Sequence, residues 1–237
     1  MDTRTDEIAP KIYRFSTYVP DADLVFNQYL IDAAEPLLFH TGMRQLFPVI
    51  REAMSRVISV ERLRWITFGH YEADECGSMN EWLMAAPQSS VAHGAMGSRV
   101  SIMDQAIRAP RLLSNNEVLD IGGYRVRRIE TPHVPHGWDA GLMYEETTQT
   151  LFAGDLFTQF GHGASSTEGD IVGPALMLEE ALHPTALTPG TAPTIRSLAQ
   201  LPSERMALMH GPVFDASPRE ALESLADYYG RQLSKLL

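Results

Sequence analysis

The sequence is poor in cysteine and in positive charge, and it has no long apolar run. Its one cysteine, Cys76, excludes an intramolecular disulfide and indicates a reducing compartment. With 19 Lys and Arg against 30 Asp and Glu, the net charge is −11, which argues against nucleic acid or an anionic membrane surface as the partner. No run approaches the roughly 20 apolar residues of a membrane span, and Met1 to Glu7 do not form a secretory signal. We therefore expect a soluble, cytoplasmic protein that binds neither nucleic acid nor a membrane.

The length and the order of predicted elements indicate one domain over residues 1–237. An apolar fraction of 44% is enough for a sizeable core. Helices are predicted near Leu46–Val57, after a capping box at Ser78–Glu81, at Gly97–Ile107, Pro174–Ala186 and Thr191–Leu201, and from Ser217 onwards. Strands are predicted at Ile12–Val19, Leu24–Ile31, Leu37–His40, Leu63–Phe68, Ser90–Ala92, Val118–Ile121, Tyr124–Glu130, Leu142–Glu145, Thr150–Ala153 and Met206–Met209. This order predicts two sheets packed face to face with helices outside, an α+β four-layer αβ/βα sandwich.

A triplet of polar side chains follows the apolar run that ends at Phe68. His70, Glu72 and Asp74 occupy alternate positions, so an extended segment would aim all three side chains to one side. One imidazole and two carboxylates directed to one point suit a metal that takes mixed nitrogen and oxygen ligands.

Three more loops place a metal-binding side chain at the end of a predicted strand. These side chains are His136, Asp155 and His210. In the first of these loops, His133 competes with His136 for the same role. His162 lies between two glycines of a loop over residues 158–173 that is rich in Gly, Ser and Thr, and we expect it to be exposed.

The motifs in their order resemble those of the metallo-β-lactamase fold. They are His70-x-Glu72-x-Asp74, His136-x-x-Asp139, Gly154-Asp155-Leu156-Phe157 and His210-Gly211. They are most similar to the diiron branch, which comprises flavodiiron proteins and free-standing oxygen-binding diiron proteins. Hydrolases of the fold usually have His-x-His-x-Asp-His as the first motif, whereas this chain has Glu72 at the second histidine. The resemblance spans the chain from Asn27-Gln28-Tyr29-Leu30-Ile31 to His210.

The resemblance implies two metal ions. One ion would be bound by His70, Glu72 and His136, the other by Asp74 and His210, with Asp155 as the bridge. Carboxylate-rich sites suit iron or manganese, whereas histidine-rich tetrahedral sites suit zinc, so we expect two iron ions with zinc or manganese as alternatives. His133 would then support the site from behind or form a hydrogen bond within its loop. Asp139 would orient a ligand histidine or stabilise the turn rather than bind metal.

Two departures from the family concern Glu75 and the flavin. The family often has a histidine directly after the aspartate of its first motif, and Glu75 stands there instead. Glu75 is a candidate ligand, a ligand by way of water or a proton relay. Tyr71 flanks two ligands, and we take it with Glu75 as a candidate catalytic residue. The family's FMN domain has no counterpart here, so we expect no FMN bound by this chain.

The first hypothesis is a diiron protein that binds O2, and possibly NO. It would act as a sensor or carrier with a signalling partner, or as a reductase fed by a separate electron donor. The alternative is a metal-dependent hydrolase that uses a bridging hydroxide. The resemblance also implies a homodimer.

Overall fold

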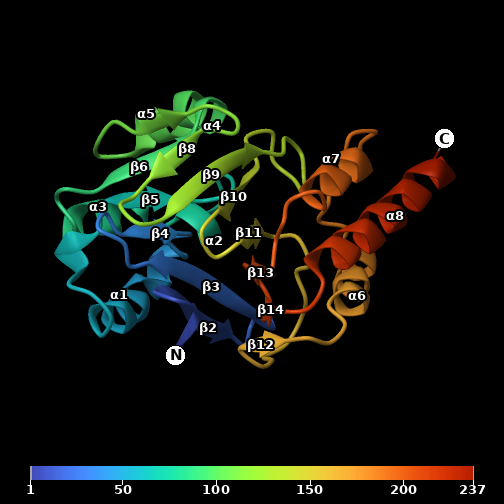
Figure 1. Cartoon of the computed structure of the whole chain (residues 1–237), viewed down its shortest axis with the longest axis horizontal. Coiled ribbons are helices and arrows are strands. Elements are labelled where there is room, and N and C mark those ends of the chain that lie inside the picture. Colours follow the sequence, from blue (N-terminus) through green and yellow to red (C-terminus); the bar gives the residue numbers. More distant parts are fainter. Residues whose placement is uncertain (1, 237) are drawn as a thin grey trace.

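The computed structural model describes residues 2–236, and two seven-stranded sheets form its centre (Figure 1). The first sheet has the order β1 to β7, with antiparallel pairs as far as β4 and parallel pairs from there on. Its strands are β1 (Thr3–Ala9), β2 (Ile12–Val19), β3 (Leu24–Ile31), β4 (Leu37–Phe39), β5 (Trp65–Thr67), β6 (Ser90–Gly94) and β7 (Arg111–Leu113).

The second sheet has the order β12-β14-β13-β11-β10-β9-β8. Its central strands β11 and β13 are parallel, whereas β8 to β11 form an antiparallel meander. The strands are β8 (Val118–Asp120), β9 (Arg125–Glu130), β10 (Gly141–Glu145), β11 (Thr150–Gly154), β12 (Ser166–Thr167), β13 (Arg205–Leu208) and β14 (Val213–Phe214).

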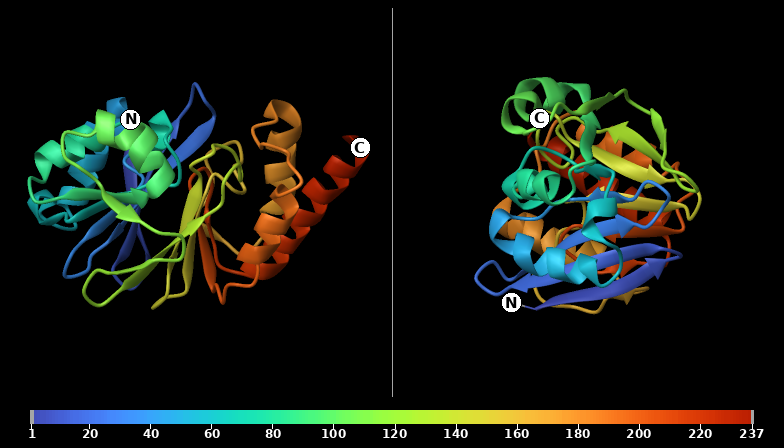
Figure 2. Two further views of the ribbon diagram at one scale, coloured as in Figure 1. Left: turned by 90° about the horizontal axis from the view of Figure 1, so that it is seen from above. Right: turned by 90° about the vertical axis from the view of Figure 1, so that its left-hand side faces the viewer.

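Helices cover the outer face of each sheet, so the predicted four-layer sandwich is confirmed (Figure 2). The first sheet carries α1 (Phe47–Ser55), α2 (Ala73–Cys76), α3 (Met79–Ala85), α4 (Ala95–Gly97) and α5 (Met103–Gln105). The second carries α6 (Val172–Leu182), α7 (Thr191–Leu198) and α8 (Pro218–Leu236). No helix within residues 2–236 combines the length and apolar character needed to cross a membrane.

Three clusters of buried side chains hold these layers together. One lies between the sheets and includes Phe152, whose ring contacts those of Tyr29 and Phe39. The other two lie under the two helical layers, around Trp82 in the first and Leu222 in the second. Burial of apolar surface on both faces explains why the central strands read as continuous apolar runs.

Several predicted elements need correction. The strands β1, β7, β12 and β14 were not predicted, because they are short or rich in polar residues. The predicted capping box is wrong, since the Ser78 hydroxyl donates to the carbonyl of Thr41 at 2.7 Å instead of capping α3. Helix α6 ends at Leu182 rather than at Ala186, because His183 takes a left-handed φ of 50° directly before a proline. The helix predicted from Gly97 is interrupted by a π-helical turn over Ser98–Ile102.

Candidate metal centre

The strand ends that carry the candidate ligands meet at one edge of the sandwich. Asp155 follows β11 and His210 follows β13, and these parallel neighbours bring both residues to the same edge of the second sheet. His136 lies in the loop between β9 and β10, and His70 lies in the loop after β5 of the first sheet. The site therefore lies between the two halves of the sandwich.

The His70, Glu72 and Asp74 segment is not extended, which corrects the sequence argument. Glu72 is the last extended residue before α2, and Asp74 belongs to the single turn of that helix. The turn separates the carboxylates, so that Glu72 joins His70 whereas Asp74 is carried towards His210. The alternating pattern predicted the right residues for the wrong geometric reason.

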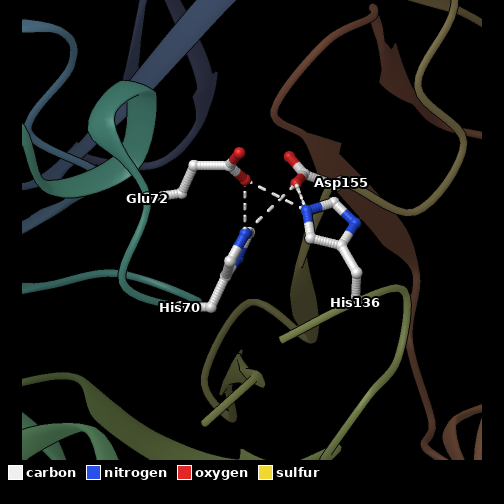
Figure 3. Close-up of side chains that lie close together, drawn as sticks. All are labelled: His70, Glu72, His136 and Asp155. Atoms are coloured by element: carbon white, nitrogen blue, oxygen red, sulfur yellow. Dashed lines mark hydrogen bonds and ion pairs between the residues drawn. The ribbon is translucent and has the colours of Figure 1, made fainter. Parts of the chain in front are cut away.

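The first group of side chains consists of His70, Glu72, His136 and Asp155 (Figure 3). Nε2 of His70 and Nε2 of His136 lie 2.7 and 3.0 Å from the same Glu72 oxygen, Oε2. Nε2 of His136 also lies 3.4 Å from Oδ2 of Asp155. Two imidazoles and two carboxylates thus converge on one point, with ligand atoms all within 4.8 Å of one another.

The second group consists of Asp74, Asp155 and His210. Nε2 of His210 lies 3.1 Å from Oδ2 of Asp74 and 3.4 Å from Oδ1 of Asp155. Asp155 therefore turns one oxygen to each group. This is the arrangement that a carboxylate bridging two metal ions requires.

Two of the histidines are oriented by contacts at their other ring nitrogen. Nδ1 of His210 lies 2.9 Å from the carbonyl oxygen of Val25, which leaves Nε2 as the atom facing the carboxylates. Nδ1 of His70 lies 3.3 Å from Oε1 of Glu75. Both contacts are of the kind that orient metal-binding histidines.

The carboxylates of the site favour positive charge at its centre, as the pKa shifts of the histidines show. Burial lowers the pKa of His70, but the carboxylates of Glu75 and Glu72 outweigh it and raise that pKa to about 12. Burial also lowers the pKa of His210, and Asp155 and Asp74 reverse this and raise it to about 10. Hydrogen bonds with His136 and His70 hold the pKa of Glu72 well below its usual range. Such a site attracts cations.

The residues fit a pair of metal ions. Oδ1 of Asp74 and Oδ1 of Asp155 are buried and accept no hydrogen bond from any residue between 2 and 236. Buried carboxylate oxygens without a donor are costly unless a cation satisfies them. The donor set of three histidines and three carboxylates is the mixed type that suits iron or manganese.

Glu75 lies behind His70 rather than in either group. Its side chain is fully buried, and Oε2 accepts a hydrogen bond of 2.7 Å from the backbone N–H of His70. Oε1 lies 3.3 Å from His70 Nδ1 and 3.3 Å from His40 Nε2. These contacts turn Glu75 away from the ligand groups and towards His70, a supporting position that was not predicted. Its roles as a ligand, a ligand by way of water, a proton relay or a catalytic residue stay predictions.

The other candidate residues lie outside both ligand groups. His133 is exposed in the turn before His136 and is not part of either group. Tyr71 is partly exposed, and its backbone N–H donates to Asp139 at 3.0 Å. Asp139 thus supports the loop of His70, whereas His162 is exposed and lies against Tyr18. The catalytic role proposed for Tyr71 stays a prediction.

Sequence reasoning missed buried side chains that surround the site. Arg128 in β9 donates to the carbonyls of Phe68 and Gly69, and it contacts His93 at 3.2 Å. His93 and His40 are also buried behind the site, where they lie against Asp139 and Glu75, respectively. One signal was available: Arg128 shares the buried face of β9 with Val126.

A cavity of about 180 Å³ adjoins both groups. The proposed ligands Glu72, Asp74, His136, Asp155 and His210 form one part of its wall. The part towards α6 and α8 is mostly apolar but includes Glu179 and Tyr229. Leu156, Phe157, Ala175, Leu178, Leu182 and Leu225 are among its apolar lining residues. A small, weakly polar molecule can therefore reach the ligand side chains from this side.

The chain is similar in sequence to one protein family and to several known proteins. The model of the ODP family beta lactamase matches residues 24–177. The chain is similar to the diflavin flavoprotein A 2 of Synechocystis, with 27% identity over 138 residues, 56% of this chain and 23% of that protein. It is also similar to the anaerobic nitric oxide reductase flavorubredoxin of Klebsiella pneumoniae, with 24% identity over 86% of this chain and 44% of that protein.

Among solved structures, the metal-soaked Flv1 flavodiiron core of Synechocystis has a similar fold, with a TM-score of 0.79 and 21% identity. The match covers 98% of this chain and 61% of that one. The chain thus spans less than half the length of these two curated relatives. At this identity the structural likeness establishes the fold.

Proposed function

The chain belongs to the ODP family of beta lactamases, and from this we propose that it is a non-heme diiron protein that binds O2 or NO. The two ions would lie in the two side-chain groups, with His70, Glu72 and His136 at one, Asp74 and His210 at the other, and Asp155 between them. Flavodiiron relatives support a two-metal centre, and iron is the metal that we propose for it.

The observation that carries this proposal is the donor set around Asp155. One oxygen of Asp155 faces each group, and Glu72 contributes a carboxylate to the first. A second histidine in place of Glu72 would make that group richer in nitrogen and better suited to zinc. Carboxylate enrichment therefore favours iron over zinc.

The residues around the site favour binding of a small uncharged ligand. Two iron ions, when bound, would supply the coordination positions and electrons that O2 or NO chemistry requires. Leu156, Phe157 and Leu178 keep one wall of the cavity apolar, which favours a diatomic gas over charged solutes. Val25 and Glu75 keep the two imidazoles turned towards the carboxylates.

Electrons for any reduction would come from a separate donor. Two iron ions exchange two electrons between their common oxidation states, whereas reduction of O2 to water takes four. The flavorubredoxin relative is named a nitric oxide reductase, which supports NO as a ligand here too. A protein that only binds the gas would act instead as a sensor or carrier with a signalling partner. We also propose that the protein is a cytoplasmic homodimer that binds neither nucleic acid nor membranes.

A second candidate function is metal-dependent hydrolysis of an ester, thioester or phosphodiester. The cavity of about 180 Å³ favours it, because this space exceeds what a diatomic molecule needs. The same two groups would then hold zinc or manganese, and Asp155 would still lie between the ions.

Metal analysis together with optical spectroscopy separates the two functions. We expect purified protein to contain two iron ions per chain, and the reduced form to develop a near-ultraviolet or visible band when O2 or NO is added. The Asp155→Ala variant is the matched control and should lose both the metal and the band. Stoichiometric zinc with a featureless spectrum would overturn the diiron proposal and favour hydrolysis.

A further inference from the structure

Each group of candidate ligands depends on loops that are held from the opposite sheet. The first group depends on the loop after β5 of the first sheet, which carries His70. The second depends on the loop after β13 of the second sheet, which carries His210. Two buried polar side chains, Arg128 and Asn27, cross between the sheets to reach these loops.

Arg128 extends from β9 of the second sheet to the loop of His70. It donates to the carbonyls of Phe68 at 2.7 Å and of Gly69 at 3.1 Å, which directly precede His70. It also donates to the carbonyl of Asp139 at 3.1 Å, in the loop that carries His136. One side chain therefore joins the two loops that supply the first group.

The burial of Arg128 indicates a specific role. Only 3% of the residue is exposed, and burial lowers its pKa to about 10 although Glu75 and Asp139 oppose this. A buried guanidinium is costly unless its donors are satisfied. Three backbone carbonyls and Nδ1 of His93 accept from its two terminal nitrogens, whereas Nε has no acceptor among residues 2–236. An apolar residue of similar volume would fill the space but would leave the two loops unconnected.

Asn27 reaches in the opposite direction, from β3 of the first sheet to the loop of His210. Its fully buried side-chain amide donates to the carbonyls of Leu208 at 2.9 Å and of Gly211 at 2.8 Å. Its backbone N–H donates to Met209 at 3.0 Å. The hydroxyl of Tyr29, also in β3, donates to Leu208 at 2.6 Å.

We propose that Arg128 and Asn27 are independent positioning residues, one for each metal position. Arg128 sets the geometry of His70 and His136, and Asn27 sets that of His210. The proposal rests on the two-metal centre proposed above, but it does not depend on which gas or substrate the centre handles. It implies that the two ions can be lost separately.

Arg128 and Asn27, the two anchors, are connected with each other by longer contacts than the hydrogen bonds that each makes to its own loop. Among residues 2–236, the polar route from Asn27 to the first group passes through His40, which lies 3.4 Å from the Asn27 carbonyl and 3.3 Å from Glu75. Both distances are longer than the direct bonds of the anchors to their loops. Asp155 belongs to both groups and is the other point of coupling.

The test is a titration of metal-free protein with Fe2+ in the absence of oxygen. In Arg128→Met and in Asn27→Leu we expect one ion to bind as in the wild type, and the affinity for the other to fall about 10–100-fold. Combination with a ligand variant identifies the remaining ion. Arg128→Met with His136→Ala should still bind one ion with the wild-type affinity, whereas Arg128→Met with Asp74→Ala should bind neither ion with the wild-type affinity. The pattern should reverse for Asn27→Leu.

Further variants separate positioning from a general loss of structure. Arg128→Lys keeps the charge and one donor and should restore part of the lost affinity. If an anchor variant does not fold, as judged by circular dichroism, Asp139→Ala and Tyr29→Phe weaken the same two loops more mildly and should show the same selectivity. Equal loss of both ions in every variant, or loss of neither, would overturn the proposal.

The same measurements test the roles of Arg128 and Asn27 separately from the proposed function. A wild-type protein that binds two ions but neither O2 nor NO overturns the gas-binding function and leaves the selective loss to be decided by the titration. A wild-type protein that binds no metal overturns both.

Discussion

Glu75 supports His70 from behind, and its side chain is inaccessible to solvent. Removing its carboxylate leaves the backbone N–H and Nδ1 of His70 facing a buried space without an acceptor. An unsatisfied buried donor costs about 1–3 kcal/mol. A side chain outside both ligand groups is thus expected to affect both folding and the first metal position.

The residue-scale prediction follows from these contacts. Glu75→Ala should lower the free energy of unfolding by about 1–3 kcal/mol and weaken metal binding. Glu75→Gln keeps an acceptor oxygen, so its stability and its metal affinity should fall less. Urea denaturation and metal titration measure the two effects. Glu52→Ala is a control, because the Glu52 side chain is 66% exposed and pairs with the equally exposed Arg56. Equal behaviour of the alanine and glutamine variants would contradict the role given to Glu75.

The loop between β5 and α2 depends on a close approach at Gly69. A Cβ atom at this position would lie 2.9 and 3.0 Å from the two Glu75 oxygens and 3.1 Å from the carbonyl oxygen of Gly141. These contacts are tighter than side chains normally allow, and Glu75 cannot move without releasing His70. The loop therefore needs glycine because of packing.

The element-scale prediction compares two glycines. Gly69→Ala should destabilise the protein by about 1–3 kcal/mol through overpacking and should reduce metal content, since the loop must shift. Gly163→Ala is the matched control, because a Cβ there meets nothing within 4 Å. Thermal unfolding and metal analysis of the two variants test this. A Gly69→Ala protein with normal stability and metal content would show that the loop tolerates the displacement.

At the scale of the whole molecule, the two groups of candidate ligands lie across the two halves of the sandwich. The first sheet contributes His70, Glu72 and Asp74 through the loop and helix that follow β5, and the second contributes His136, Asp155 and His210. Bound ions would therefore link the halves and offset the repulsion among the carboxylates. Ligands that bind only the folded state stabilise it in proportion to their affinity.

Metal removal should accordingly lower the melting temperature. At a free metal concentration of 100 times Kd, binding contributes about 2.7 kcal/mol, which corresponds to about 5–10 °C for a chain of this size. Circular dichroism melting curves with and without a chelator measure this difference. The Asp155→Asn variant should show a smaller difference, and an unchanged melting temperature in the wild type would argue against ions that join the two halves.

The sequence by itself determined the two sheets, the helical layers and the six candidate ligands, because these depend on apolar periodicity and on side-chain chemistry at strand ends. The family resemblance implied how the ligands divide between two ions, and only the tertiary structure supplied the physical reason. One turn of α2 separates Asp74 from Glu72, and Asp155 faces both groups because β11 and β13 are parallel neighbours. It also decided that Glu75, Arg128 and Asn27 support the site from behind, since their partners are backbone groups distant in sequence, which no local pattern records.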